Sequence, residues 1–230
     1  MSRNPDGHRG QGHRGERHPD QGHLDRSLAA ARAGSWPFPH WILDDMLPPE
    51  PRAALLAWDP GPAAAGGEND GRRAARNGRR IFVTPARRRR DAGLAALAAL
   101  FDAPPTRAAL QALCGARLAG TALRLELCLD TDGFWLAPHT DIGAKRLTLL
   151  VSLSMGPGAG GWGTDLMTAD GRAVARASGA FNSGLLFVPG PQTWHGFVRR
   201  PIHGVRRSLI VNFVGADWRA VEELAFGPAA

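Results

Sequence analysis

Alternation of apolar and polar residues marks the C-terminal half of the chain as β-structure. In the segment 205–214 (VRRSLIVNFV), a period of two separates a mainly apolar set of residues from a mainly polar one, which is typical of a strand whose two faces meet different surroundings. Three further strands are expected at 147–154 (LTLLVSLS), 185–189 (LLFVP) and 193–197 (TWHGF). In 205–214 one face carries Val205, Arg207, Leu209, Val211 and Phe213, and the other carries Arg206, Ser208, Ile210 and Asn212.

Helical spacing of apolar residues marks the N-terminal half instead. The segments 91–101 (DAGLAALAALF) and 106–118 predict two helices, with Asp91 and Thr106 as their N-caps. The other elements expected here are an extended segment over 36–47, a short helix over 51–58 and a strand over 81–83.

This order of elements predicts a mainly β protein with flanking α-helices. A Gly-rich loop at 156–163 and an Asp170-Gly171 hairpin turn connect the strands of the second half. We therefore expect a two-sheet jelly roll, a cupin-like double-stranded β-helix, over 121–218, with the helices of 35–120 packed on one sheet. A chain of 230 residues suits a single domain with a full core, which we place at 35–230.

Residues 1–34 have a different composition. His8, His13, His18 and His23 recur at a spacing of five within Gly-, Arg- and Asp-rich sequence, and almost no apolar residue precedes Leu24. Such a segment buries too little apolar surface to fold, so it predicts a disordered tail. His-rich tracts can bind metals loosely, and a tail without a role is the alternative.

The formal net charge of +7 comes almost entirely from arginine, because Lys145 is the only lysine. An Arg-rich stretch at 72–90 could attract an anionic group, or it could be a solvated loop in an Arg-biased protein. The chain is also rich in Ala, Gly and Pro, which suits a GC-rich coding sequence as well as a nucleic-acid binder. A nucleic-acid partner is therefore not expected.

Cysteine content and hydropathy set the expected compartment. Cys114 and Cys128 form neither a metal motif nor a disulfide framework, which favours a reducing cytoplasm. No apolar run approaches the length of a membrane span, and the N-terminus lacks the apolar core of a signal peptide. A cytoplasmic protein without a membrane partner is the expectation, and the oligomeric state is left open.

The candidate chemistry lies in a His-x-Asp pair and a distal histidine. In an extended segment, side chains two residues apart point the same way, so His139 and Asp141 can reach one metal ion. His195, on another predicted strand, would complete the set. Two imidazoles and one carboxylate hold Fe(II) on one face and leave positions open for oxygen and a co-substrate.

From about residue 123 to residue 218, the chain resembles the iron(II)/2-oxoglutarate-dependent dioxygenases of the prolyl-4-hydroxylase-like branch, with a looser match at 36–49. The matching sequence segments are PHTD at 138–141, RLTL at 146–149, LLFVPGPQTWH at 185–195 and GVRRSL at 204–209. The resemblance implies Fe(II) bound by His139, Asp141 and His195, with 2-oxoglutarate and molecular oxygen as co-substrates.

The same resemblance assigns the co-substrate's far carboxylate to an Arg on the last strand. Arg206 and Ser208 share one face and match the family's G-x-R-x-S pattern, whereas Arg207 on the opposite face is the competing candidate. Related enzymes often add a Tyr hydroxyl, but this chain has no Tyr. Ser152 occupies the resembling position, and Thr148 lies on the same face, so both are candidate donors to 2-oxoglutarate.

The implied activity is hydroxylation of a C–H bond in a small molecule or an amino-acid side chain, with release of succinate and carbon dioxide. No catalytic residue beyond the metal centre is predicted. The alternative is another metal-dependent cupin-type enzyme, an isomerase or hydrolase that does not use 2-oxoglutarate. A nucleic-acid-binding module built on the Arg-rich stretch is a third hypothesis, and it leaves the ligand set unexplained.

Overall fold

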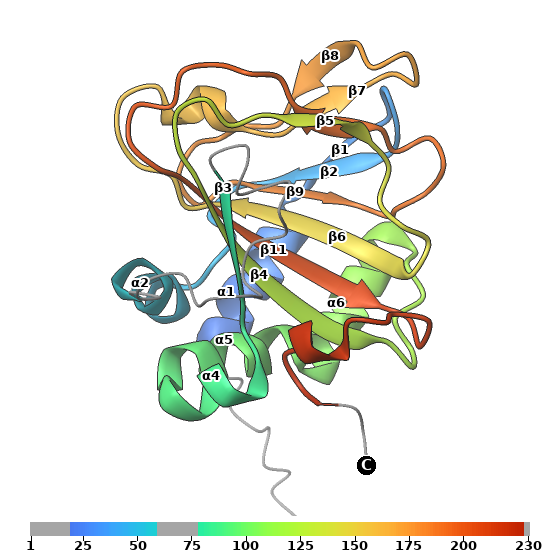
Figure 1. Ribbon diagram of the computed structural model, residues 1–230. Helices are drawn as coiled ribbons and strands as arrows, with labels where there is room; N and C mark the ends of the chain where they lie inside the picture. Colours follow the sequence, from blue (N-terminus) through green and yellow to red (C-terminus); the bar gives the residue numbers. More distant parts are fainter. Residues whose placement is uncertain (1–18, 59–77, 228–230) are drawn as a thin grey trace, which may run out of the picture.

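Two antiparallel β-sheets face each other and form the frame of the molecule (Figure 1). The computed structural model describes residues 19–58 and 78–227. The larger sheet contains, in spatial order, β1 (Arg32–Gly34), β2 (His40–Leu43), β9 (Gly184–Phe187), β6 (Lys145–Ser152), β11 (Arg206–Val214), β4 (Ala122–Asp130) and β3 (Gly78–Phe82). The smaller sheet contains β5 (Leu136–His139), β10 (His195–Phe197), β7 (Asp165–Met167) and β8 (Ala173–Arg176). The predicted double-stranded β-helix is confirmed.

Helices cover the face of the larger sheet that points away from the smaller one (Figure 1). They are α1 (Pro19–Ala29), α2 (Pro49–Ala57), α4 (Pro85–Arg90), α5 (Ala92–Asp102) and α6 (Pro104–Cys114). The chain also forms two short 3-10 turns, η1 (Ala159–Trp162), which packs against Phe134 and Phe197, and η2 (Val221–Glu223). Among the helices of the described residues, none is both long enough and apolar enough to cross a membrane.

The alternation of β11 separates a helix-covered core from an inner polar face. Leu209, Val211 and Phe213 are fully buried in the core cluster that the helices share with the larger sheet. Their neighbours Arg206 and Ser208 instead face the space between the two sheets. The predicted two-face pattern of this strand is confirmed, because one face meets apolar helices and the other lines a polar cavity.

The beginning of the chain differs from the prediction. Disorder was expected over 1–34, but residues 19–34 form α1 and β1. Leu24 and Leu28 are one helical turn apart and both buried, and His23 Nε2 lies 2.7 Å from the Asp45 carbonyl oxygen. The two leucines find their apolar partners only in the folded core, so local composition did not reveal them. His8, His13 and His18 lie outside the described residues.

Helix boundaries agree with the prediction at α5 and differ at α6. Asp91 accepts a hydrogen bond from the Leu94 amide and caps α5 as predicted. Thr106 was wrong as an N-cap, because α6 already begins at Pro104 and Thr106 donates to the Leu100 carbonyl from a fully buried position. The helix ends at Gly115, whose φ of 72° favours glycine, and not at residue 118.

Candidate metal centre and anion site

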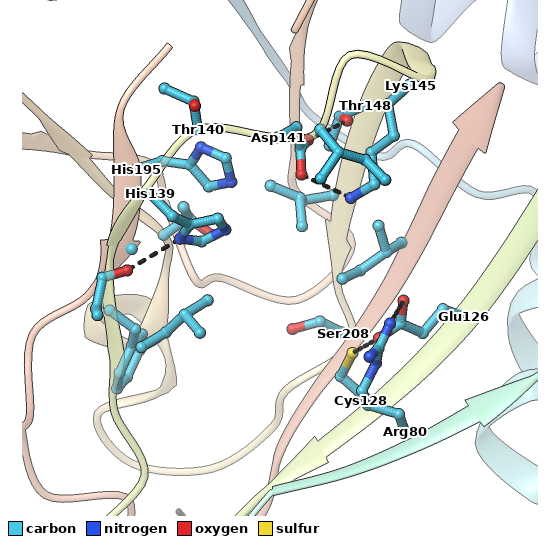
Figure 2. Close-up of a pocket in the computed structure, with 18 of the residues that line it drawn as sticks. Arg80, Glu126, Cys128, His139, Thr140, Asp141, Lys145, Thr148, His195 and Ser208 are labelled. Atoms are coloured by element: carbon cyan, nitrogen blue, oxygen red, sulfur yellow. Dashed lines mark hydrogen bonds and ion pairs between the residues drawn. The ribbon is translucent and has the colours of Figure 1, made fainter. Parts of the chain in front are cut away.

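The pairing of β5 with β10 brings the two predicted histidine ligands together. His139 at the end of β5 lies directly opposite His195 at the start of β10, and Asp141 follows two residues after His139. One ligand atom from each of the three side chains lies within 4.8 Å of the others. Within the described residues this is the single such group, so the predicted ligand set is assembled at one point (Figure 2).

Backbone carbonyls fix the orientation of both imidazoles. His139 Nδ1 lies 2.9 Å from the Ala137 carbonyl oxygen, and His195 Nδ1 lies 2.9 Å from the Thr193 carbonyl oxygen. Because a carbonyl only accepts, each Nδ1 carries the proton and each Nε2 keeps its lone pair. Metal-binding histidines are commonly held in this way.

The third ligand, Asp141, is held by two donors. Lys145 Nζ donates to Oδ1 at 2.6 Å, and the Thr148 hydroxyl donates to Oδ2 at 2.7 Å. Burial alone would raise the pKa of Asp141, but the charge of Lys145 and these hydrogen bonds outweigh it and lower the pKa to about 2.

Burial has the opposite effect on His195. It lowers the pKa of the imidazole to about 4, against the attraction of Asp141. Near neutral pH the site therefore presents a carboxylate and a neutral imidazole, which are the forms that bind a metal ion. The donor set fits a divalent transition metal such as Fe(II).

A cavity of about 470 Å³ lies beside these ligands. Figure 2 shows the two imidazoles on one side of the cavity and Arg80, Glu126 and Cys128 on the other. The cavity floor is the inner face of β4, β6 and β11. Its volume lies within the range of roughly 300–1,000 Å³ that small-molecule sites occupy.

Arg206 and Ser208 lie on one stretch of this floor. The Arg206 guanidinium is buried, pairs with Asp130, and donates through Nε to the Trp162 carbonyl at 2.7 Å. These two bonds leave other N–H groups of Arg206 without an acceptor among the described residues. The Ser208 hydroxyl has no side-chain hydrogen bond to that part of the chain either, so both residues keep donors that are available to a ligand in the cavity.

The competing candidate Arg207 points to the opposite side of the sheet. Its Nη1 donates to the carbonyl oxygens of Leu55 and Leu56 at 3.2 and 3.1 Å, near the end of α2. Strand alternation places it there, because successive side chains face opposite sides of a sheet. Of the two arginines, Arg206 alone lines the cavity.

Thr148 and Ser152 do not behave as predicted. A hydroxyl has one proton to donate, and Thr148 gives its proton to Asp141 while accepting from Asn212 Nδ2 at 2.9 Å. Ser152 donates to the Gly179 carbonyl at 2.7 Å. Neither hydroxyl therefore has a proton left for a co-substrate, so this geometry contradicts their assignment as donors.

A buried polar network behind Asp141 was missed from the sequence. Asn212 links Thr148 to Arg124, whose Nη1 lies 3.0 Å from Asn212 Oδ1, and Arg124 in turn pairs with Glu126. Alternation assigned strand faces to Thr148 and Asn212 but could not show which residues bond to them. The one available signal was polarity at buried strand positions, which usually marks hydrogen-bonded partners.

Three solved structures share this arrangement of sheets and helices. A prolyl hydroxylase from Trichoplax adhaerens, solved in complex with a hypoxia inducible factor oxygen degradation domain peptide fragment, matches with a TM-score of 0.55 and 13% sequence identity, over 84% of this chain and 88% of that chain. A prolyl-4-hydroxylase from Pseudomonas putida matches with a TM-score of 0.52 and 18% identity, over 86% of this chain and 96% of that chain. The chain has the fold of the 2-oxoglutarate/iron(II) oxygenases.

A third structure with this oxygenase fold is HygX from Streptomyces hygroscopicus, solved with nickel and 2-oxoglutarate bound. It matches with a TM-score of 0.51 and 14% identity, over 78% of this chain and 85% of that chain. No family model matches the sequence, and no curated protein matches it. Membership of the fold thus rests on structure, and the assembled His-Asp-His group lies within that same oxygenase fold.

Proposed function

We propose that the protein is an Fe(II)- and 2-oxoglutarate-dependent dioxygenase that hydroxylates a C–H bond of a small molecule or an amino-acid side chain. The observation that carries the proposal is the combination of two sites in one cavity. The group formed by His139, Asp141 and His195 offers the ligands of an iron site, and Arg206 with Ser208 offers an anion site on the same floor.

The side chains around the metal position would bind and orient Fe(II). His139 and His195 would each provide Nε2, and Asp141 would provide a carboxylate oxygen that Lys145 and Thr148 keep in place. When bound together, Fe(II) and 2-oxoglutarate supply oxidative decarboxylation to succinate and carbon dioxide, coupled to hydroxylation of the substrate by molecular oxygen. The protein's own contribution is to position both partners and to exclude competing reactions.

Arg206 and Ser208 would hold the far carboxylate of 2-oxoglutarate. A guanidinium matches a carboxylate with two parallel hydrogen bonds, and burial makes those bonds stronger than they are in water. Phe197 and Phe134 flank the guanidinium, with its central carbon 4.7 and 5.8 Å from the ring centroids. These ring contacts, with the bonds to Asp130 and Trp162, support the placement of the Arg206 guanidinium.

The alternative, a cupin-type isomerase or hydrolase without 2-oxoglutarate, gives no role to the anion site. A nucleic-acid-binding role is disfavoured by the contacts of the Arg-rich stretch. Arg80 pairs with Glu126, Arg87 lies over Trp58, and Arg88 lies over Phe226 at 3.8 Å. These arginines make contacts within the protein, which leaves less positive charge available to bind a polyanion such as a nucleic acid.

Succinate formation tests the proposal. With Fe(II), oxygen and 2-oxoglutarate, the full-length protein should convert 2-oxoglutarate to succinate slowly even without its substrate. His139→Ala should abolish the conversion, and Arg206→Met should raise the concentration of 2-oxoglutarate needed for half-maximal rate. Arg207→Met is the matched control, since it removes the same charge from the other face. Succinate formation that persists in His139→Ala would refute the proposed site.

A further inference from the structure

The two carboxylates that line the cavity, Glu126 and Asp141, already accept hydrogen bonds from protein donors. Glu126 accepts from Arg80 Nε and the Cys128 thiol at one oxygen, and from Arg80 Nη2 and Arg124 Nη1 at the other. A carboxylate has about four acceptor positions, so Glu126 is saturated. Asp141 accepts from Lys145 and Thr148 and keeps its remaining capacity for a metal. Neither carboxylate is therefore left to bind a cationic group of a substrate.

Lys145, in contrast, has hydrogen-bond donors that the described residues do not use. Its ammonium group has three N–H donors, and its single partner among the described residues is Asp141 Oδ1. The side chain lines the cavity and is 17% exposed, so two donors remain for a ligand. Figure 2 shows Lys145 beside Asp141, across the cavity from the Arg80–Glu126 pair.

Metal binding would leave the positive charge of Lys145 less well neutralised. The charge of Lys145 is offset in the described site by Asp141, which is also the single anionic ligand of the candidate metal group. A divalent cation on Asp141 draws on the same negative charge and repels the ammonium group nearby. A second carboxylate beside Lys145 would relieve this repulsion.

Lys145 is also separate from the anion site for the co-substrate. Arg206 and Ser208 lie near the start of β11, whereas Lys145 is the first residue of β6 and pairs with Val214 at the other end of β11. Ile142 and Trp218 line the cavity as well and provide apolar surface for a hydrocarbon group. Besides Arg80 and Arg124, which both pair with Glu126, the cavity therefore has the cationic side chains of Lys145 and Arg206 at opposite ends of the same strand pair.

We infer that Lys145 binds a carboxylate of the substrate and places an adjacent C–H bond at the metal. The substrate class is a small carboxylic acid with a hydrocarbon portion, such as an amino acid with a free carboxylate. This inference rests on the proposed function, because the metal and 2-oxoglutarate would bind in the same cavity. It makes Lys145 a specificity-determining residue.

Paramagnetic relaxation in solution tests the inference without a known substrate. The full-length protein is loaded with Mn(II) in place of Fe(II) and saturated with 2-oxoglutarate. Isovalerate and isovaleramide serve as probes, because they have the same shape and differ in charge. Relaxation of their protons by Mn(II) reports binding near the metal, and relaxation of the 2-oxoglutarate methylene protons reports the co-substrate in the same sample.

The native protein should bind isovalerate about 10-fold more tightly than isovaleramide, which is the value of one charge-assisted hydrogen bond. Lys145→Met should remove this preference, and Lys145→Arg should retain it. Arg146→Met is the control, because Arg146 is the neighbouring cation and pairs with Asp217 outside the cavity.

Three results would overturn the inference. They are equal binding of the two probes by the native protein, including no binding of either, a preference that survives Lys145→Met, and loss of 2-oxoglutarate relaxation in Lys145→Met at a Mn(II) concentration that saturates this variant. The last result would assign Lys145 to the co-substrate. If Mn(II) in the native protein does not relax the 2-oxoglutarate protons at all, the proposed function is refuted, and the inference with it.

Discussion

At the scale of single residues, the directions of the hydrogen bonds determine what each side chain can do. Thr148 and Ser152 both have hydroxyls on the inner face of β6, yet each gives its proton to a protein acceptor. Ser208, two residues beyond Arg206, has a hydroxyl without such a partner among the described residues. Residue type alone could not separate these three hydroxyls.

Thr148 is expected to support metal binding. Thr148→Val keeps the shape of the side chain but removes the donor to Asp141 Oδ2 and the acceptor for Asn212. Loss of such a partner of a metal ligand typically weakens metal affinity by about 10- to 100-fold. Equilibrium dialysis with Mn(II) would measure the change, with Thr168→Val, at a half-buried position outside the cavity lining, as the control. Unchanged affinity in Thr148→Val would show that Lys145 alone positions Asp141.

Ser208 and Ser152 make a matched pair for the co-substrate. Ser208→Ala should weaken 2-oxoglutarate binding by about 10-fold or more, which corresponds to one hydrogen bond to a charged carboxylate. Ser152→Ala should leave the affinity unchanged, because its hydroxyl is bonded to Gly179. Titration of the metal-loaded protein with 2-oxoglutarate gives both values. A larger loss in Ser152→Ala than in Ser208→Ala would restore the original assignment of Ser152.

At the scale of secondary structure, an element was predicted well where its own residues show a clear apolar and polar periodicity. The alternation in 205–214 predicted β11 and placed Arg206 and Arg207 on opposite faces, as the structure shows. The helix α1 was missed because its apolar side is narrow. This side is buried only when α1 packs against α6 and the segment around Asp44. Its polar composition resembled that of a tail.

The first helix should contribute to stability. Leu24 is fully buried in the core shared with the larger sheet, so Leu24→Ala should lower the free energy of unfolding by about 2–5 kcal/mol. Leu56→Ala, at a partly buried position, should have a smaller effect. Chemical denaturation would measure both, and an effect of Leu24→Ala below that of Leu56→Ala would contradict the packing of α1.

At the scale of the whole molecule, the fold and the ligand set could be predicted, but the connections within the cavity could not. The His-x-Asp spacing of His139 and Asp141 and the strand position of His195 indicated one group in the sequence, and the structure brings these three side chains together. The bonds from Asn212 to Thr148 and from Arg124 to Asn212 depend on the approach of strands far apart in sequence. These contacts hold the site in place, and no local pattern encodes them.

The most direct test of the account is the visible charge-transfer absorption of Fe(II) chelated by 2-oxoglutarate, recorded without oxygen on the full-length protein. The account predicts a band in the native protein, none in His139→Ala, and a band in Arg206→Met that requires more 2-oxoglutarate. Because His139→Ala keeps the N-terminal histidines, it also controls for metal bound there. A native protein that binds Fe(II) through the three ligands but gives no band with 2-oxoglutarate would contradict the account.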